Sequence, residues 1–280
     1  DLRGPVSREG AQAGLGGATG GAITVVLIGT SGWQYKSWRG RFYPEKLAQK
    51  VWLEHYAARF RTVEVNNAFY RLPEASTFSA WAQRTPPDFM VAVKASRYLT
   101  HIKRLKDPAE PVGRFMERAS HLGDKLGPVL VQLPPTLRID LGALDETLRL
   151  FPASVRVAVE FRHDSWFTEE TYALLTERNA AFCLADSPHR RTPVCRTADW
   201  GYIRFHEGKA APRPCYGRAV LDTWAGRLAG LWDDSADVYA FFNNDPEGCA
   251  VRDARVFAGA AERAGLSPTR VPSAPETKVG

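Results

Sequence analysis

The sequence predicts a single (β/α)₈ barrel, and three observations favour this fold. Its 280 residues lie in the usual range for one α/β barrel. Short runs rich in β-branched or aromatic residues alternate with longer amphipathic stretches, which is the pattern of parallel strands joined by helices. Each short run begins apolar and ends polar, as expected where barrel strands reach an active-site face. We therefore predict one barrel domain over residues 22–266.

The elements follow one another in a regular order. Strands are predicted at residues 23–29, 62–66, 89–94, 128–133, 156–161, 181–186, 201–206 and 238–243. Helices are predicted at residues 45–60, 75–84, 112–126, 141–150, 169–178, 220–232 and 250–264. Residues 187–199 contain Pro188 and Pro193 and are too short and broken for a good helix. The helix after the sixth strand is therefore expected to be missing or replaced by a loop.

The two ends of the chain lack this pattern. Residues 1–21 are rich in glycine and alanine without a hydrophobic period, and residues 267–280 carry three prolines. Segments that bury little apolar surface do not recover the entropy lost on ordering. We predict a disordered leader over 1–21 and a disordered tail over 267–280.

Composition bounds the class of protein. The hydrophobic fraction of 44% and the charged fraction of 24% are ordinary for a globular protein. No apolar run approaches the roughly 18 residues that a membrane span needs, and the N-terminus carries no secretory signal pattern. We expect a cytoplasmic protein with no membrane partner and no obligate protein partner.

The four cysteines have wide spacings. Cys183, Cys195, Cys215 and Cys249 form no Cys-x-x-Cys pair, which argues against a zinc ribbon and a thioredoxin-type site. Reduced thiols are expected. Other catalytic signatures, such as a Walker loop, His-Glu-x-x-His and Gly-x-Ser-x-Gly, are also absent from the sequence.

Polar residues end seven of the predicted strands. Side chains alternate across a strand, so Glu160 and Arg162 share one side of theirs, as Arg204 and His206 do. Because a barrel gathers these strand ends on one face, the sequence predicts a polar pocket there. The candidate catalytic residues are Glu64, Glu160, His163 and Asp186. The candidate substrate-binding residues are Trp33, Asn66, Tyr70, Lys94, Gln132, Arg162, Arg204, His206, Asn243 and Asn244.

Six segments, in order, carry a family resemblance: GTSGW from Gly29, VEVNNAFY from Val63, FMVAVK from Phe89, VQLPP from Val131, VEFRHDSW from Val159 and FNN from Phe242. Through them, residues 23–266 resemble the YecE-like proteins of domain-of-unknown-function family 72. The resemblance implies the barrel fold and supplies no function. The last motif of the family often has His and Asn where this chain has Cys249 and Asp253, so no role for an imidazole is transferred to that place.

Glu64 and Glu160 admit two interpretations. They could face each other as an acid and base pair, with one pKa raised and one carboxylate ionised. A separation of about 5 Å would suit a retaining glycosidase, and roughly 6.5 to 9.5 Å an inverting one. Alternatively, each pairs with a nearby cation, Glu160 with Arg162 or Arg204, and Glu64 with Lys94.

Lys94 and His163 also have alternative roles. Lys94 could act as a Schiff-base amine of lowered pKa, or it could hold an anionic group. His163 could be a general acid or base, or an ordinary hydrogen-bonding residue.

No cofactor is predicted, and a divalent metal is the one alternative. Its ligands would be Glu64, Glu160, Asp186 and His206. The cationic side chains of Lys94, Arg162 and Arg204, which also lie at strand ends, would repel such an ion.

Basic and aromatic residues crowd the loops that leave the same strand ends. The loop residues are Arg97, Tyr98, His101, Lys103, Arg104, Lys106, His189, Arg190, Arg191, Arg196, Lys209, Arg213, Tyr216 and Arg218. Trp33, Tyr35, Trp38, Tyr70 and Trp166 add flat surfaces for stacking, unless they pack beneath the loops. An anionic small molecule or a nucleic acid is the expected partner.

These features give three functional hypotheses. The first is an enzyme that acts on a phosphate-bearing sugar, nucleotide or nucleic acid by acid/base chemistry. The second is a DNA- or RNA-binding protein without catalysis that uses the basic aromatic rim. The third is a glycosidase acting on a neutral sugar.

Overall fold

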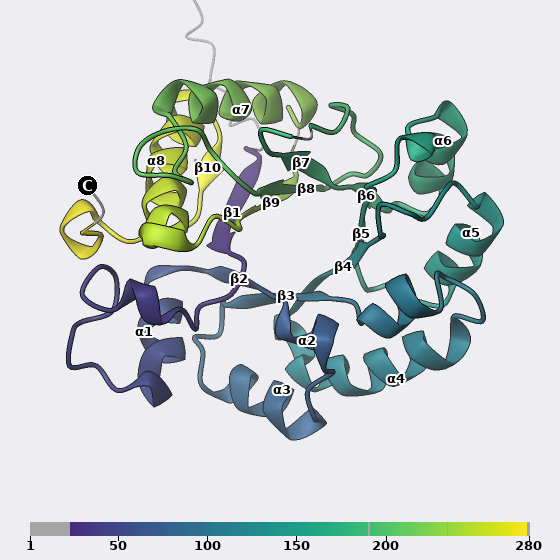
Figure 1. The fold of residues 1–280 in the computed structure, drawn as a ribbon, viewed down its shortest axis with the longest axis horizontal. Coiled ribbons are helices and arrows are strands. Elements are labelled where there is room, and N and C mark those ends of the chain that lie inside the picture. The colour runs from purple at the N-terminus through teal and green to yellow at the C-terminus, as the bar shows by residue number, and fades with distance from the viewer. Residues whose placement is uncertain (1–22, 190, 234, 279–280) are drawn as a thin grey trace, which may run out of the picture.

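The computed structural model describes residues 23–189, 191–233 and 235–278, and its strands form two parallel sheets surrounded by helices (Figure 1). One sheet has the order β10-β1-β9-β8-β7, and the other has the order β2-β3-β4-β5-β6. The strands are β1 (Val25–Thr30), β2 (Thr62–Val65), β3 (Met90–Lys94), β4 (Leu126–Gln132), β5 (Val157–Glu160), β6 (Ala181–Phe182), β7 (Leu184–Asp186), β8 (Gly201–Phe205), β9 (Asp237–Phe242) and β10 (Ser267–Pro268). The helices are α1 (Trp52–Arg59), α2 (Asn67–Tyr70), α3 (Ala75–Gln83), α4 (Ala109–Ala119), α5 (Leu141–Arg149), α6 (Glu169–Glu177), α7 (Arg218–Leu231) and α8 (Cys249–Arg263).

The two sheets approach each other at both edges. Cys183 alone separates β6 from β7, and its amide donates to the carbonyl of Val159 on β5. At the other junction Ser31 forms an isolated parallel bridge with Glu64, next to β1 and β2. The predicted α/β class with parallel strands is thus confirmed. Strand pairing, however, gives two sheets instead of one continuous closed barrel.

Most elements lie where the sequence predicted them, with two differences at helix ends. The helix predicted over 45–60 begins only at Trp52, because the Arg39 guanidinium holds the preceding segment by donating to the carbonyls of Glu45 and Leu47. The helix predicted over 112–126 ends at Ala119 and continues as a 3₁₀ turn broken at Gly123, whose φ is 57°. Between β7 and β8 the described residues contain no helix, as predicted.

Buried apolar residues form two layers. One contains Leu27, Leu130, Ala158, Tyr202 and Phe241, which alternate along their strands with the residues that face the helices. The larger layer lies between strands and helices. The inner side of the sheets is therefore apolar at its base, and its polar groups lie toward the C-terminal ends of the strands.

The segment after Ser267 corrects a prediction. Instead of a disordered tail, Ser267 and Pro268 pair with β1, and the amide of Thr269 donates to Val26. Further on, Glu276 caps a short turn and pairs with Arg59 at 2.8 Å. The edge of β1 had backbone groups left to pair, and this segment satisfies them. The predicted leader over 1–21 lies outside the described residues.

The cysteines correct a second prediction. Cys215 and Cys249 form a disulfide, with their Cα atoms 4.8 Å apart, whereas Cys183 and Cys195 are free thiols. The loop after β8 folds back onto the start of α8, where the Tyr216 amide donates to Asp253. A spacing of 34 residues is therefore no obstacle to pairing.

Helix length bears on membrane association. The longest described helix, α8, has 15 residues. Within the described chain, none combines the length and the apolar character needed to cross a membrane.

Gly29 tests the close approach of the two sheets. A Cβ at this position would lie 2.3 Å from the carbonyl oxygen of Thr62. We expect Gly29→Ala to lower the free energy of unfolding by about 1–3 kcal/mol, because β1 and β2 would have to separate. Urea denaturation measures this change.

Gly226 provides the matched control. A Cβ at Gly226, in α7, would meet nothing within 4 Å. Gly226→Ala should therefore stabilise the protein by about 0.5–1 kcal/mol through helix propensity. Equal stability of Gly29→Ala and the wild type would show that the sheets do not approach as described.

Candidate functional site

Arg204 lies at the centre of the polar side chains and joins two carboxylates. It comes from β8 and is 2% exposed. Its Nη2 donates to Oε1 of Glu64 at 2.8 Å, and its Nη1 donates to Oε2 of Glu160 at 2.6 Å. One guanidinium thus connects β2, β5 and β8.

Glu64 is fully buried and accepts several further hydrogen bonds. Ser31 Oγ donates at 2.7 Å, the Tyr202 hydroxyl at 2.6 Å and Asn66 Nδ2 at 3.3 Å. Burial alone would raise the pKa of Glu64, but Arg204 and the donated hydrogen bonds outweigh burial and hold this pKa below its usual value. Glu64 is therefore an ionised, fixed anchor.

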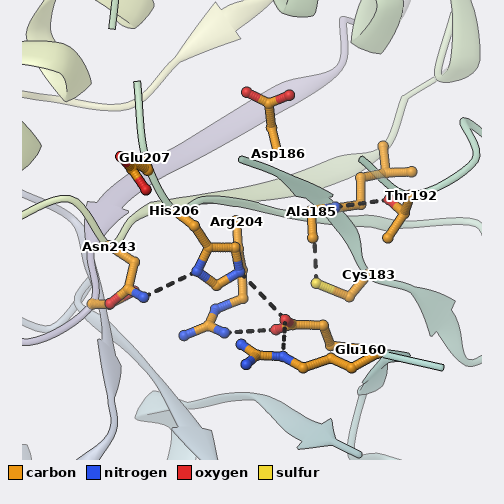
Figure 2. Close-up of polar contacts among 12 residues, drawn as sticks. Glu160, Cys183, Ala185, Asp186, Thr192, Arg204, His206, Glu207 and Asn243 are labelled. Atoms are coloured by element: carbon orange, nitrogen blue, oxygen red, sulfur yellow. Dashed lines mark hydrogen bonds and ion pairs between the residues drawn. The ribbon is translucent and has the colours of Figure 1, made fainter. Parts of the chain in front are cut away.

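Glu160 is surrounded by basic groups (Figure 2). Besides Arg204, Arg162 donates from Nε at 3.1 Å, and His206 Nε2 lies 3.3 Å from the same oxygen, Oε1. Burial opposes ionisation, but Arg204, His206 and Arg162 hold the pKa of Glu160 well below its ordinary value. Neither Glu64 nor Glu160 is thus a carboxylic acid near pH 7.

The cation pairing predicted for the two glutamates is correct for one of them. Glu160 pairs with both Arg162 and Arg204, as that interpretation expected. The partner expected for Glu64 was Lys94, and this is wrong because Arg204 occupies the place.

His206 is oriented from both sides of its ring. Asn243 Nδ2 lies 3.1 Å from His206 Nδ1, and Figure 2 shows this contact opposite Glu160. If Asn243 is the donor, Nδ1 is the acceptor and the proton of the imidazole lies on Nε2, which is 3.3 Å from Glu160 Oε1. His206 and Asn243, both predicted as substrate-binding residues, thus contact each other.

Asp186 does not join the other carboxylates. Its neighbour Ala185 is the residue that pairs with Arg204 in the ladder, so the Asp186 side chain lies on the opposite side of β7. Figure 2 shows its carboxylate directed away from the Arg204 cluster, and Oδ1 lies 3.1 Å from Arg191 Nε.

The metal alternative is therefore not supported by the arrangement of its four ligands. Within the described ranges, no group of three or more His, Cys, Asp or Glu side chains is placed to hold a metal ion. Two of the proposed ligands, Glu64 and Glu160, are occupied by Arg204.

Lys94 ends β3 beside these groups and is 9% exposed. Its Nζ lies 4.0 Å from the centroid of the Phe69 ring, and it makes no hydrogen bond or ion pair to any residue that the structure describes. Burial, reinforced by the charges of Arg204 and Arg162, lowers the pKa of Lys94 to about 8, although Glu64 and Glu160 oppose this shift.

The loop after β3 places more basic groups near Lys94. It contains a π-helical turn, Tyr98–Ile102, followed by the left-handed backbone of Arg104 (φ 54°) and Leu105 (φ 64°). Such backbone is costly for residues other than glycine and is common at functional sites. The turn packs His101 edge-on against Phe69, with ring centroids 4.9 Å apart.

The pKa of His101 is lowered by burial and by the positive charges around the loop after β3. Burial lowers its pKa first, and neighbouring cations lower it further. We call these residues the basic cluster: Lys94, Arg97, His101, Arg104 and Arg162.

Two hollows open at the C-terminal ends of the strands. The larger, of about 340 Å³, is bordered by Glu160, Arg162 and His206. The smaller, of about 170 Å³, is bordered by Ser31 and Asn66. Strand β3, which carries Lys94, lies between the strands that border them.

The candidate binding residues Trp33, Tyr70 and Gln132 differ from one another in how accessible their side chains are. Trp33 is buried and packs edge-on against Trp81. Tyr70 is 80% exposed, so it remains available for stacking. Gln132 ends β4 and pairs with Glu160 of β5. Its side-chain amide makes no hydrogen bond to a described residue.

Two further candidates have structural roles. His163 Nδ1 accepts from the amide of Ser165 at 3.1 Å and so caps a short turn. Asn244 donates to the carbonyl of Pro214 and to Asp253, which binds the loop after β8 to α8.

The expected basic aromatic rim is only partly present. Trp38 and Trp166 are fully buried, as the packed alternative expected, and Tyr216 is buried too. Arg196 donates to the carbonyls of Ala198 and Leu231. Arg190 lies outside the described residues. On described residues the rim remains after β3, and Arg191, Lys209 and Arg213 also stay exposed in the loops after β7 and β8, as does Arg218 at the start of α7.

Sequence reasoning missed two donors of the site. Neither Ser31 nor Tyr202 is among the residues predicted for the site. Tyr202 lies two residues before Arg204, and the alternation of a strand would have placed both on one side. Ser31 carried no comparable signal.

Comparisons with known proteins identify the family. A family model described as "Protein of unknown function DUF72" matches residues 27–278. The chain belongs to this family. This confirms the resemblance seen in the sequence motifs.

Individual proteins similar to this chain support the same family. The UPF0759 protein YunF of Bacillus subtilis is 26% identical over 259 residues, covering 81% of this chain and 91% of YunF. The UPF0759 protein YecE of Escherichia coli K12 is 32% identical over 118 residues, covering 42% of this chain and 43% of YecE. The crystal structure of a DUF72 family protein from Thermotoga maritima is 31% identical, with a TM-score of 0.76 and coverage of 85% and 99%.

Removing Arg204 tests the charge arrangement. Arg204→Met leaves two buried carboxylates without their shared cation, and we expect it to cost about 3–5 kcal/mol of unfolding free energy at pH 7. The control is Arg263→Met, which breaks the exposed pair with Asp222 and should cost about 0–1 kcal/mol. Guanidinium denaturation measures both.

The pH dependence of this loss gives a second measurement. In the wild type, the lowered pKa values of Glu64 and Glu160 contribute stability above their unfolded value of 4.5, and this stability is lost as pH falls through the folded values. Without Arg204, burial raises both pKa values, so the deficit of Arg204→Met should shrink from pH 7 to pH 5. A deficit that is constant over this range would contradict the arrangement.

Proposed function

We propose that this protein is an enzyme that binds a small, phosphate-bearing sugar or nucleotide at the C-terminal ends of its strands and moves protons there. In this proposal the two sheets act as one (β/α)₈ barrel, whose inner polar side chains form the active site. The larger hollow, beside Arg162 and His206, receives the substrate.

The main support for this proposal is the ammonium of Lys94. It is nearly buried, yet it has no anionic partner among the described residues, while Arg204 already pairs with both nearby glutamates. A buried charge is costly unless it is paired. An anionic group of the substrate would supply the missing partner, and Arg97 and Arg162 would add to its attraction.

Neutral polar groups fit the sugar part of such a substrate. Asn66 Oδ1 is buried without a hydrogen-bond partner in the described chain. The Gln132 amide, also near the strand ends, makes no hydrogen bond to a described residue. Both can bind hydroxyl groups, which donate and accept.

We assign distinct roles to the charged groups. Arg204 and Glu64 hold the strands in place, because every contact they make is internal and buried. Glu160 and His206 are the proton-transfer pair, in which His206 takes and gives the proton and the ionised Glu160 holds the imidazole, since both border the larger hollow and approach within 3.3 Å. Lys94 and Arg162 bind the anion.

A second candidate function is binding of single-stranded nucleic acid. A groove of about 330 Å³ beside α2 and α4 is bordered by the exposed Tyr70 and by Tyr98, Arg71 and Arg114. Stacking on aromatic rings beside basic side chains suits such a ligand. The neutral-sugar glycosidase has less support, because both glutamates have lowered pKa values and neither is available as the acid.

Sulfate binding tests the anion site, because the charge of sulfate is constant between pH 6 and 9. We expect sulfate to bind below pH 8 and to weaken as the pH rises through about 8, where Lys94 loses its proton. Lys94→Met should weaken binding at pH 7 by about tenfold or more. Isothermal titration calorimetry measures both effects.

The matched control is Lys125→Met. Lys125 donates to the carbonyls of Ala82 and Thr85, away from the strand ends, so its removal should leave sulfate binding unchanged. Equal binding by wild type and Lys94→Met would contradict the assignment of Lys94.

Turnover tests the proton-transfer pair. On any phosphosugar or nucleotide that the wild type converts, Glu160→Gln should lower kcat by about 10²–10⁴-fold while sulfate still binds. Unchanged kcat would remove Glu160 from the mechanism. Binding of oligonucleotides that is lost with Tyr70→Ala, without any turnover, would support the second candidate instead.

A further inference from the structure

We propose that Lys94 is a nucleophile that forms a Schiff base with an aldehyde or ketone carrying an anionic group. This inference rests on the proposed anion site and adds the reacting group of the substrate, a carbonyl. It gives the site a covalent step in addition to binding.

The surroundings of Lys94 make its ammonium easier to deprotonate than that of an exposed lysine, so more of the neutral amine is present near pH 7. Three N–H donors of a charged lysine need acceptors when they are buried. Lys125 shows what a satisfied lysine of this chain looks like, with Nζ 2.6 Å from the carbonyl and 3.1 Å from the hydroxyl of Thr85. Among the described residues, Nζ of Lys94 has the face of the Phe69 ring and no hydrogen-bond acceptor, although Lys94 is more deeply buried than Lys125.

Fixed positive charges act in the same direction. Arg204 cannot turn away, because Glu64 and Glu160 hold its two terminal nitrogens. Desolvation and an adjacent cation are the two devices that activate a lysine as a nucleophile. Lys94 has both, and its lowered pKa is their consequence.

The position of Lys94 in the fold also suits a nucleophile. Lys94 is the last residue of β3, and its Cβ lies on the same side as the apolar inner layer residue Ala92. In its sheet, β3 lies between β2, which leads to the smaller hollow, and β5, whose Glu160 borders the larger one. We infer that a carbonyl carbon reaches Nζ from the C-terminal face, where the hollows open.

The step balances without a further reagent. The neutral amine adds to the carbonyl carbon, forming the C–N bond, and the carbonyl oxygen takes a proton to give a carbinolamine. This hydroxyl leaves as water with a second proton, and the nitrogen forms the double bond to carbon. Overall, the lysine ammonium and the carbonyl give a protonated imine and one water. The imine then draws electrons from the adjacent carbon, which is useful for breaking a C–H or C–C bond there.

The anionic group has its own place in the basic cluster. Arg97, Arg104 and Arg162 all influence the same imidazole, His101, and so lie around one region of the loop after β3. A phosphorylated aldose or ketose in its open-chain form carries both required groups. This is the substrate class that we infer.

Reductive trapping tests the inference on the full chain. The protein is incubated at pH 7 with glyceraldehyde 3-phosphate and sodium cyanoborohydride, and modified lysines are located by peptide mass mapping. We expect Lys94 to be modified at least about tenfold faster than the exposed Lys46, because more of its amine is neutral. Lys125, held by three acceptors, serves as the hydrogen-bonded control.

Two further comparisons separate the possible outcomes. Glyceraldehyde without phosphate should modify Lys94 more slowly, and sulfate should protect Lys94 from the phosphorylated probe. Modification of Lys94 no faster than that of Lys46 overturns the inference, and this needs no variant that might fail to fold. If sulfate then still binds through Lys94, the anion site stands without the covalent step. If both aldehydes modify Lys94 equally fast and sulfate does not protect it, the amine is reactive but the proposed anion site is wrong.

Discussion

The bridge from Arg204 to Glu64 and Glu160 is the interaction on which the rest of the site depends. The buried guanidinium of Arg204 binds Glu64, 140 positions away in the chain, and Glu160, 44 positions away. A buried ion pair of this kind is not by itself strong evidence of stability, because desolvation offsets much of its Coulomb energy. Its effect here is to fix the ionisation of both glutamates and to hold β2, β5 and β8 in a single arrangement.

That arrangement determines which groups remain for a ligand. With both carboxylates committed to Arg204, Lys94 is left near the strand ends without a counter-ion among the described residues, and Arg162 adds to the positive field. The left-handed backbone at Arg104 and Leu105 is a cost that the folded chain carries to place the loop after β3 beside Lys94. The anion site that we propose rests on these facts, and family membership alone would not have indicated one, because the matching family is described as one of unknown function.

Much of this site could be predicted from strand periodicity. Residues two apart share a side, so the sequence correctly grouped Glu160 with Arg162 and Arg204 with His206. The same rule shows why Asp186 lies apart, because its neighbour Ala185 is the one that pairs with Arg204. Periodicity along a strand does not say how far neighbouring strands are staggered, and so the partner of Glu64 was assigned to Lys94 instead of Arg204. Contacts between segments distant in sequence were equally out of reach, as for the disulfide between Cys215 and Cys249 and the pairing of Ser267 with β1.

The state of the Lys94 amine is the most direct test of this account. A nuclear magnetic resonance titration of a ¹³C-labelled lysine side chain, assigned with Lys94→Arg, would give its pKa with and without sulfate. The account predicts a value of about 8 in the free protein, and an increase when sulfate is bound, because the anion stabilises the ammonium. A value near 10.5 that sulfate does not change would mean that Lys94 is an ordinary solvated lysine and would contradict both the anion site and the proposed nucleophile.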